Sequence, residues 1–278
     1  MKRMILCMSL SSQYGPALTE QLTMLKKAGF DGFFTRWERG VDLSPLAEAA
    51  RREDMIFQSI HAPHLLAADM WERTEKTQDA VQELLDCLEL CHRLQVPIMV
   101  AHTIIGFDKH TPTVFGLENF DRVVARARAL QVKIALENTE GEEYLAALME
   151  RYRDDPYVGF CWDTGHENCY NYGKDMLALH GDRLIATHLN DNLGVCDPVG
   201  GITWKDDLHL LPFDGKCDWQ GIVARMKRHG FRGPLTFELV RQSKPGRHEN
   251  DAYEKMPLED YFVQAFERAC RVAAMMEE

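Results

Sequence analysis

Short runs of β-branched, aromatic and other apolar residues recur along the whole chain and alternate with amphipathic segments. The runs are too short for helices, and in the segments between them apolar residues repeat at spacings of three and four. Eight strands are expected, at residues 3–8, 31–36, 57–61, 98–103, 133–138, 158–163, 184–190 and 235–239. Strands that alternate with helices pair in parallel through right-handed crossovers, so the pattern predicts an α/β fold with a parallel sheet.

The number of repeating units favours a closed barrel. A (β/α)8 TIM barrel typically needs ~250 residues, and this chain has 278. Helices are expected at residues 17–28, 45–52, 77–94, 117–130 and 142–152. No Ser/Gly-rich linker interrupts the pattern, so a single domain over residues 1–278 is expected. A doubly wound open sheet is the alternative, but it needs a glycine-rich turn after the first strand, where this chain has Ser-Leu-Ser-Ser.

Composition argues against several classes of protein. The formal charge is −11 at pH 7, so a protein that binds nucleic acid through a basic face is not expected. No apolar run approaches the ~20 residues that a membrane span requires, so no membrane partner is expected. The apolar run at the N-terminus is too short for a secretory signal. The eight cysteines contain no Cys-x-x-Cys spacing, which predicts reduced thiols and a cytoplasmic location.

Ionisable side chains close six consecutive expected strands. In order, these strand ends carry His61, His102, Glu137, Asp163, His188 and Glu238. The carboxyl ends of barrel strands share one mouth, and six such groups packed there without a counter-ion would suffer desolvation and repulsion. A divalent cation removes this conflict. Imidazole nitrogens and carboxylate oxygens suit Zn²⁺, Mn²⁺, Co²⁺ or Fe²⁺, with Mg²⁺ possible where carboxylates dominate.

The expected ligands fall into two tiers. The core metal ligands are Glu137, Asp163, His188 and Glu238. Three carboxylates and one imidazole leave positions for substrate oxygens or water around a five- or six-coordinate ion. The second tier, which could bind substrate or hold further ions, comprises His61, His102, His166, Asp207 and His209.

Two long connections follow the last two strands, at residues 191–218 and 240–256. Connections of this length in a compact domain are typically lids or binding loops. The second one carries Arg241, Lys244 and Arg247, which could receive a phosphate or carboxylate, although a solvated loop is the simpler expectation. Residues that could line the mouth are Trp37, Glu38, Trp204 and Trp219, with core packing at least as good an explanation for Trp219.

Five sequence elements at these strand ends and in the first long loop also occur together in a known group of proteins. They are Leu136-Glu137-Asn138-Thr139, Trp162-Asp163-Thr164-Gly165-His166, His188-Leu189-Asn190-Asp191-Asn192, Asp207-Leu208-His209-Leu210-Leu211-Pro212 and Glu238. In this order the chain resembles the xylose isomerase-like barrels. That superfamily includes sugar and sugar-phosphate isomerases and epimerases, and also the endonuclease IV type of DNA repair enzyme. The resemblance extends over nearly the whole chain and does not define the substrate.

The resemblance implies a function. In enzymes like the ketose 3-epimerases, the positions that match the four core ligands hold one divalent ion, commonly manganese. Glu137 and Glu238 would then be the catalytic pair that removes and returns a carbon-bound proton of a small sugar or sugar phosphate, through a metal-stabilised enediolate. His166 would contact substrate. Such epimerases often carry an arginine a few residues beyond the strand-seven histidine, where this chain has Leu193-Gly194-Val195, so the sugar stays open. A homodimer is expected by analogy, and Mn²⁺ or Zn²⁺ is the first expectation for the metal.

The endonuclease IV branch is the alternative. There, three zinc ions are held by nine side chains, and a metal hydroxide attacks a phosphodiester at abasic DNA. All nine have counterparts here: His61, His102, Glu137, Asp163, His166, His188, Asp207, His209 and Glu238. The acidic charge, and the absence of loops that combine clustered Lys and Arg with wedge side chains, argue against it. A metal-dependent dehydratase or lyase and a metal-binding module without activity are further alternatives.

Overall fold

Eight parallel strands form the centre of the computed structural model, which describes residues 3–108, 111–197, 199 and 201–277. The strands are β1 (Leu6–Leu10), β2 (Gly32–Arg36), β3 (Ile56–His61), β4 (Ile98–His102), β5 (Lys133–Glu137), β6 (Val158–Asp163), β7 (Leu184–His188) and β8 (Leu235–Phe237). Their order around the sheet is β7-β6-β5-β4-β3-β2-β1-β8, and every ladder is parallel. All eight expected strands are present, with ends that differ by a few residues.

The two end strands, β7 and β8, approach each other and nearly close the barrel. A parallel bridge joins Leu189 to Phe237 just beyond β7. Leu189 N donates to Thr236 O at 2.8 Å, and Thr236 N donates to the Thr187 hydroxyl at 3.1 Å. The expected (β/α)8 TIM barrel is therefore confirmed for the part of the chain that the structure describes.

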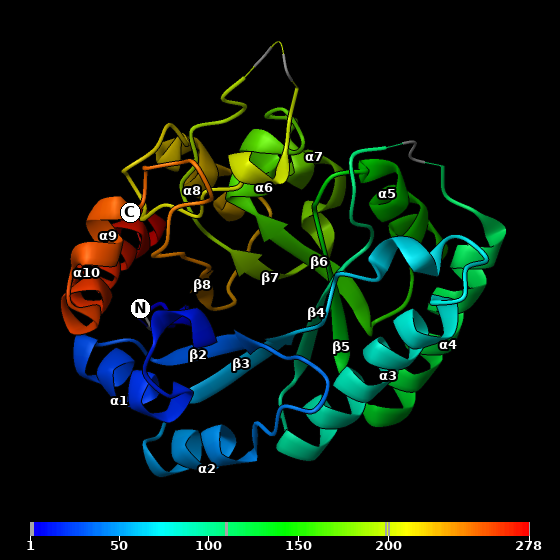
Figure 1. The fold of residues 1–278 in the computed structure, drawn as a ribbon, viewed down its shortest axis with the longest axis horizontal. Helices are drawn as coiled ribbons and strands as arrows, with labels where there is room; N and C mark the ends of the chain where they lie inside the picture. Colours follow the sequence, from blue (N-terminus) through cyan, green and yellow to red (C-terminus); the bar gives the residue numbers. More distant parts are fainter. Residues whose placement is uncertain (1–2, 109–110, 198, 200, 278) are drawn as a thin grey trace.

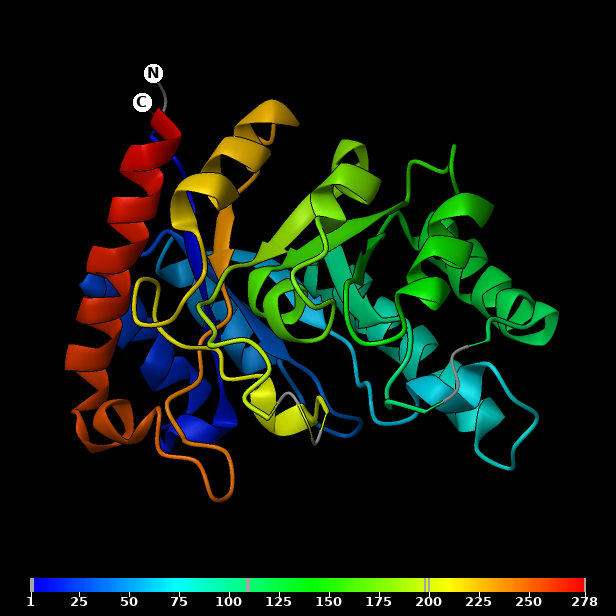
Figure 2. The ribbon, with the colours of Figure 1, turned by 90° about the horizontal axis from the view of Figure 1, so that it is seen from above.

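The longer helices cover the outside of the barrel (Figure 1). The helices are α1 (Leu18–Ala28), α2 (Ser44–Arg52), α3 (Thr77–Leu94), α4 (Val114–Leu130), α5 (Glu142–Arg151), α6 (Thr164–Cys169), α7 (Met176–His180), α8 (Trp219–Arg228), α9 (Asp251–Lys255) and α10 (Leu258–Glu277). Short 3-10 turns are η1 (Ser12–Tyr14), η2 (Ala67–Met70), η3 (Gly181–Arg183) and η4 (Trp204–Asp206). The C-terminal helix α10 runs alongside α1 (Figure 2), where the rings of Phe30 and Phe266 meet edge to face at 5.3 Å. The first and last helices thus pack together.

Helix α4 begins three positions before the expected residue 117, and its N-terminal cap explains the difference. The Thr113 hydroxyl accepts a hydrogen bond from Gly116 N at 3.1 Å, which fixes the first turn. Glycine lowers helix propensity, so Gly116 makes this first turn difficult to predict from the sequence. It is needed there because a Cβ would lie 2.1 Å from the indole of Trp71.

The barrel interior is filled by small side chains below the mouth. Successive strand residues point to opposite faces, so residues two positions before the expected ligands share their inward face. These positions hold Val100, Ala135, Cys161 and Ala186, which form a buried cluster of their own. The larger core lies between strands and helices. Among the described residues, no helix has both the length and the apolar composition that a transmembrane span requires.

Asp191 anchors the long loop after β7. Its backbone exchanges two hydrogen bonds with Leu210, each 2.9 Å long. Its carboxylate, fully buried, accepts from the backbone N–H groups of Asn192, Phe213 and Cys217 and from the Trp219 indole, at 2.8–2.9 Å. One side chain therefore connects the end of β7, the loop and the start of α8.

Replacing Asp191 tests this anchor. Asp191→Asn keeps the shape but presents an NH₂ group to N–H donors, so we expect it to lower the free energy of unfolding by about 2–4 kcal/mol. Denaturant unfolding measures the loss. Asp218→Asn is the matched control, because Asp218 caps α8 at an exposed position and asparagine caps a helix equally well. Equal stability of the two variants would contradict the anchoring role.

Candidate metal centre

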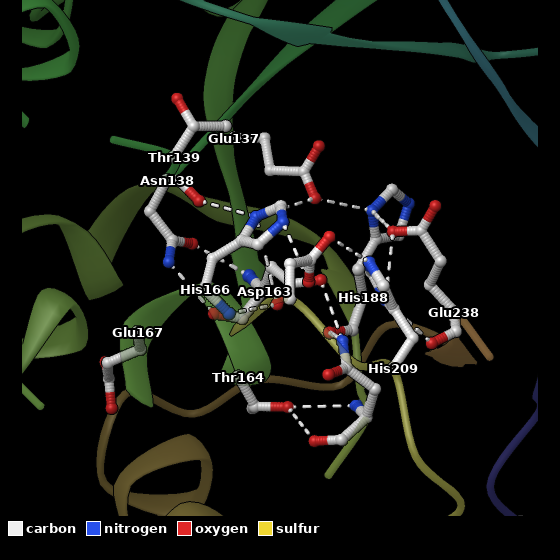
Figure 3. Close-up of polar contacts among 12 residues, drawn as sticks. Glu137, Asn138, Thr139, Asp163, Thr164, His166, Glu167, His188, His209 and Glu238 are labelled. Atoms are coloured by element: carbon white, nitrogen blue, oxygen red, sulfur yellow. Dashed lines mark hydrogen bonds and ion pairs between the residues drawn. The ribbon is translucent and has the colours of Figure 1, made fainter. Parts of the chain in front are cut away.

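Four acidic and imidazole side chains from different strands meet at the carboxyl end of the barrel. Ligand atoms of Glu137, Asp163, His188 and Glu238 all lie within 4.8 Å of one another. Figure 3 shows these side chains pointing toward a common centre. His188 Nδ1 is 2.7 Å from Glu137 Oε1 and 3.1 Å from Glu238 Oε2. The strand ends thus converge as the sequence predicts, while their role as metal ligands stays a prediction.

Glu137 joins this group to a second one. Its other oxygen, Oε2, lies 3.2 Å from His61 Nε2 and 3.3 Å from His102 Nε2. The ligand atoms of these three residues also lie within 4.8 Å of one another. The Glu137 carboxylate therefore belongs to two groups of donors, and because the residue is fully buried it has no contact with solvent.

A third group comes from α6 and the loop after β7. Asp207 lies between two imidazoles, with Oδ1 3.5 Å from His166 Nε2 and Oδ2 2.9 Å from His209 Nε2. His166 Nδ1 lies 3.8 Å from Glu137 Oε1, and His209 Nδ1 lies 3.9 Å from Glu238 Oε2, so this group borders the first. All nine residues singled out in the sequence therefore gather at one mouth.

Hydrogen bonds to backbone carbonyls orient three of the imidazoles. The Nδ1 atoms of His61, His166 and His209 lie 2.7, 2.9 and 3.2 Å from the carbonyl oxygens of Ala62, Asn138 and Glu238. A carbonyl only accepts, so each Nδ1 carries the proton, and in the neutral ring Nε2 presents a lone pair. This is the arrangement that orients histidine ligands in metal sites.

Those lone pairs face carboxylate oxygens. His61 Nε2 and Glu137 Oε2 are both buried, and neither makes a hydrogen bond with the described residues; the same holds for Asp207 Oδ1, opposite His166 Nε2. Two facing lone pairs without a proton or cation between them repel each other, and buried polar atoms without partners are costly. A divalent cation between them would remove both costs, so the donor set fits a metal.

The charges of the groups lead to the same conclusion. Burial by itself raises the pKa of Glu137, but His188, His102 and His61 outweigh burial and hold this pKa well below its ordinary value. Burial lowers the pKa of His209, but Asp207 and Glu238 raise it above its ordinary value. Burial raises the pKa of Asp163 to about 6. The acids therefore require nearby positive charge, which either imidazolium protons or a divalent cation can supply.

Neutral side chains hold the ligands in place. Asn190 Nδ2 donates to Asp163 Oδ2 at 2.9 Å, and Asn138 Oδ1 accepts from Asp163 N at 2.8 Å. Asp163 Oδ1 in turn caps α6 by accepting from His166 N at 2.7 Å. The Phe34 ring stacks on His188 at 4.5 Å. Asn138 and Asn190 lie in the motifs noted above, whereas nothing in the sequence singled out Phe34.

Some expected residues lie elsewhere, and others are new. The prediction that Trp37 lines the mouth is wrong, because this residue belongs to the core and its indole N–H donates to Val41 O. Trp219 also packs in the core, as the alternative stated above has it, and its indole N–H donates to Asp191. Trp204 is half exposed. His64, which the motifs do not single out, packs its ring 4.7 Å from that of His102. Its position three residues after His61, beyond a proline, is the signal that could have found it.

A comparison with protein-family models matches residues 22–268 to the xylose isomerase-like TIM barrels. The chain belongs to this family. An uncharacterized protein, y4fM of Sinorhizobium fredii, is 34% identical over 233 residues, which cover 77% of this chain and 68% of that protein. A probable endonuclease 4 of Halorhodospira halophila is 30% identical over 199 residues, which cover 59% of this chain and 65% of that protein.

Solved structures show the same fold at lower identity. The IolI protein with a bound zinc atom has a TM-score of 0.78 and 20% identity, with 98% of each chain covered. L-ribulose 3-epimerase has a TM-score of 0.71 and 16% identity, with 100% of this chain and 95% of that chain covered. At these identities the similarity establishes the fold alone, and the reaction has to be inferred from the residues of the site.

Removing divalent cations tests the fit of the site. If the buried acids depend on a bound cation, we expect a chelator to lower the melting temperature by about 5–10 °C and added Mn²⁺ or Zn²⁺ to restore it. Asp163→Asn removes the charge of one expected ligand, so the chelator should lower the melting temperature of this variant less than that of wild type. Glu118→Gln, at an exposed position of α4, should respond to the chelator as wild type does. Calorimetry with metal analysis measures both. A melting temperature that is insensitive to the chelator in metal-containing protein would contradict the fit.

Proposed function

We propose that this protein is a divalent-metal-dependent isomerase or epimerase of a small sugar, sugar phosphate or related hydroxy-carbonyl compound. One observation carries the proposal: Glu137 and Glu238 both contact His188 Nδ1, at 2.7 and 3.1 Å. In the barrel order these glutamates lie on opposite sides of β7. Two carboxylates that flank one centre can remove a proton from a substrate carbon and return it.

The four core residues would hold the cation. A divalent ion bound by Glu137, Asp163, His188 and Glu238 would polarise a substrate carbonyl and make the neighbouring carbon-bound proton more acidic. Three carboxylates with one imidazole suit Mn²⁺ or Zn²⁺, with Mg²⁺, Co²⁺ or Fe²⁺ as alternatives.

The two glutamates differ in their surroundings. Burial by itself raises the pKa of Glu238, but His188 and His209 outweigh burial and keep this pKa well below its ordinary value, so the carboxylate is ionised at neutral pH. Glu238 is 8% exposed and Glu137 is fully buried. Glu238 is therefore the acid/base group that substrate and solvent reach more readily, and Glu137 is its partner at the closed side of the centre.

The family relationship supports an enzyme. An L-ribulose 3-epimerase and a zinc-bound protein share this barrel. The expected homodimer and cytoplasmic location stay predictions.

A phosphodiesterase of the endonuclease IV type is the second candidate, and one observation favours it. Besides the core group, the ligand atoms of two further groups, His61–His102–Glu137 and His166–Asp207–His209, each lie within 4.8 Å of one another. Three such groups could hold three ions, as the resemblance implies for that branch. The relative described as a probable endonuclease 4 adds to this candidate. The net charge of −11 weighs against DNA as the substrate.

Glu238→Gln tests the proton-transfer assignment. The amide keeps the size of the side chain but cannot act as a base, so we expect kcat to fall by about 10²–10⁴-fold while most substrate binding is kept. Solvent deuterium exchange into a panel of ketoses and their phosphates measures the reaction. Glu259→Gln, exposed in α10, is the control. Full activity of Glu238→Gln would show that the acid/base assignment is wrong.

The two candidate functions differ in metal content and product. For the isomerase we expect deuterium at carbon-bound positions of a ketose and no cleavage of an oligonucleotide that contains an abasic site. Incubation of metal-reconstituted protein with both substrates, alongside metal analysis, measures the difference. Cleavage without ketose exchange, in protein with three ions per chain, would favour the endonuclease and contradict the isomerase.

A further inference from the structure

The three basic residues after β8 have different partners. Arg241 donates to the carbonyl oxygens of Tyr253, Glu254 and Met256, which fixes the turn around α9. Arg247 pairs with Glu249 at 2.6 Å and also contacts Asp206 and Cys196. Both guanidinium groups are thus engaged in holding loops together, and among the described residues neither has an ion pair with a member of the nine-residue cluster.

Lys244 is the exception. Its Nζ lies 3.7 Å from Asp207 Oδ2 and 5.6 Å from the centre of the Trp204 ring. Charge-assisted hydrogen bonds to carboxylates are typically about 2.7–2.9 Å long, so this ion pair is loose and leaves the ammonium N–H groups able to bind a ligand. The side chain is 21% exposed. Lys244 therefore presents a positive charge at the edge of the candidate metal centre.

Arg36 approaches Glu238, another acid of the centre. It ends β2, its side chain is 48% exposed, and its guanidinium lies 3.9 Å from Glu238 Oε1. His209 contacts both acids concerned, with Nδ1 3.9 Å from Glu238 Oε2 and Nε2 2.9 Å from Asp207 Oδ2. Arg36 and Lys244 therefore flank one continuous row of side chains, and both keep donors free for a ligand.

We propose that Lys244, assisted by Arg36, binds an anionic oxygen group of the substrate, a phosphate or a carboxylate. The substrate is then a charged hydroxy-carbonyl compound rather than a neutral sugar. This inference rests on the proposed function and names the class of its substrate. An ammonium group is a point charge that binds phosphate well, and a guanidinium matches phosphate or carboxylate through paired N–H groups. The half-exposed Trp204 adds an apolar face beside the ammonium.

The acids of the mouth do not prevent this binding. Asp207 is paired with His166 and His209, and Glu238 with His188. Each of the two carboxylates thus already contacts an imidazole, whereas Lys244 and Arg36 each have one carboxylate partner, at 3.7 and 3.9 Å, among the described residues. The side chains of Lys244 and Arg36 are also more exposed than those of Asp207 and Glu238, so an incoming anion meets the two cations first.

Lys244→Met removes the charge and keeps an apolar side chain against Trp204, so it tests the proposal. We expect inorganic phosphate to bind metal-loaded Lys244→Met about tenfold more weakly than wild type, as the loss of one hydrogen bond to a charged group implies. Lys244→Arg should restore most of the affinity. Lys216→Met, an exposed lysine of the loop after β7, is the matched control and should bind as wild type does. Isothermal titration with phosphate and with acetate measures all four proteins.

The outcomes separate this proposal from the proposed function. If Lys244→Met weakens the binding of acetate but not that of phosphate, the result would support a carboxylate substrate. Equal phosphate and acetate affinities in Lys244→Met and wild type, with both folded by circular dichroism, would overturn the subsite. The subsite would also be overturned if deuterium exchanged faster into neutral ketoses than into their phosphates and into sugar acids, and if Lys244→Met left this exchange unchanged. The proposed isomerase function would stand in that case. Weaker phosphate binding in Lys244→Met without exchange into any ketose would support the subsite and overturn the isomerase.

Discussion

The carboxylate of Glu137 sets the constraint on which the mouth of the barrel depends. It is fully buried at the end of β5, and both its oxygens face imidazole nitrogens. A buried carboxylate is stable only beside compensating positive charge. Part of that compensation comes from His188 on β7, whose Nδ1 lies 2.7 Å from Glu137 Oε1. Burial lowers the pKa of His102 to about 4, so this imidazole is neutral at pH 7 and supplies no charge. A barrel brings these groups together because its strand ends lie in a ring, so that side chains of β3, β5 and β7, two strands apart in the sheet, meet at one mouth.

The loops that complete the site need supports of their own. Asp207 and His209 lie on the connection after β7, far along the sequence from any strand of the barrel, yet they meet His166 and Glu238 within hydrogen-bonding or ion-pair distances. The Asp191 carboxylate holds this connection through four hydrogen bonds. Asn250 Nδ2, in the loop after β8, donates a hydrogen bond to Leu208 O. The third group of donors thus exists only because buried polar contacts hold two long loops against each other.

Strand periodicity explains what could be predicted from the sequence. His102, Glu137, Asp163 and His188 could be assigned to the mouth because each ends an expected strand, and the ends of barrel strands share one mouth. The small residues two positions before them, on the same face, form the buried cluster that the structure shows. The loops have no such period. The anchoring role of Asp191, and the different partners of Arg241, Lys244 and Arg247, depend on tertiary contacts between segments far apart in sequence. The core position of Trp37 was missed for the same reason.

The sharing of Glu137 between two donor groups links metal content to chemistry. If only the core group held an ion, Glu137 Oε2 would face the imidazoles of His61 and His102 without a cation between them, and the mouth would keep room for a substrate with several oxygens. If each group held an ion, Glu137 would serve two of the three groups, and the added positive charge would favour an anion such as a phosphodiester. The two candidate functions, isomerase and nuclease, thus use the same side chains and differ in the number of metal ions that these side chains would hold. For this reason the nine residues alone do not distinguish the two candidate functions, whereas the proposed anion subsite at Lys244 and Arg36 would separate a charged substrate from a neutral one.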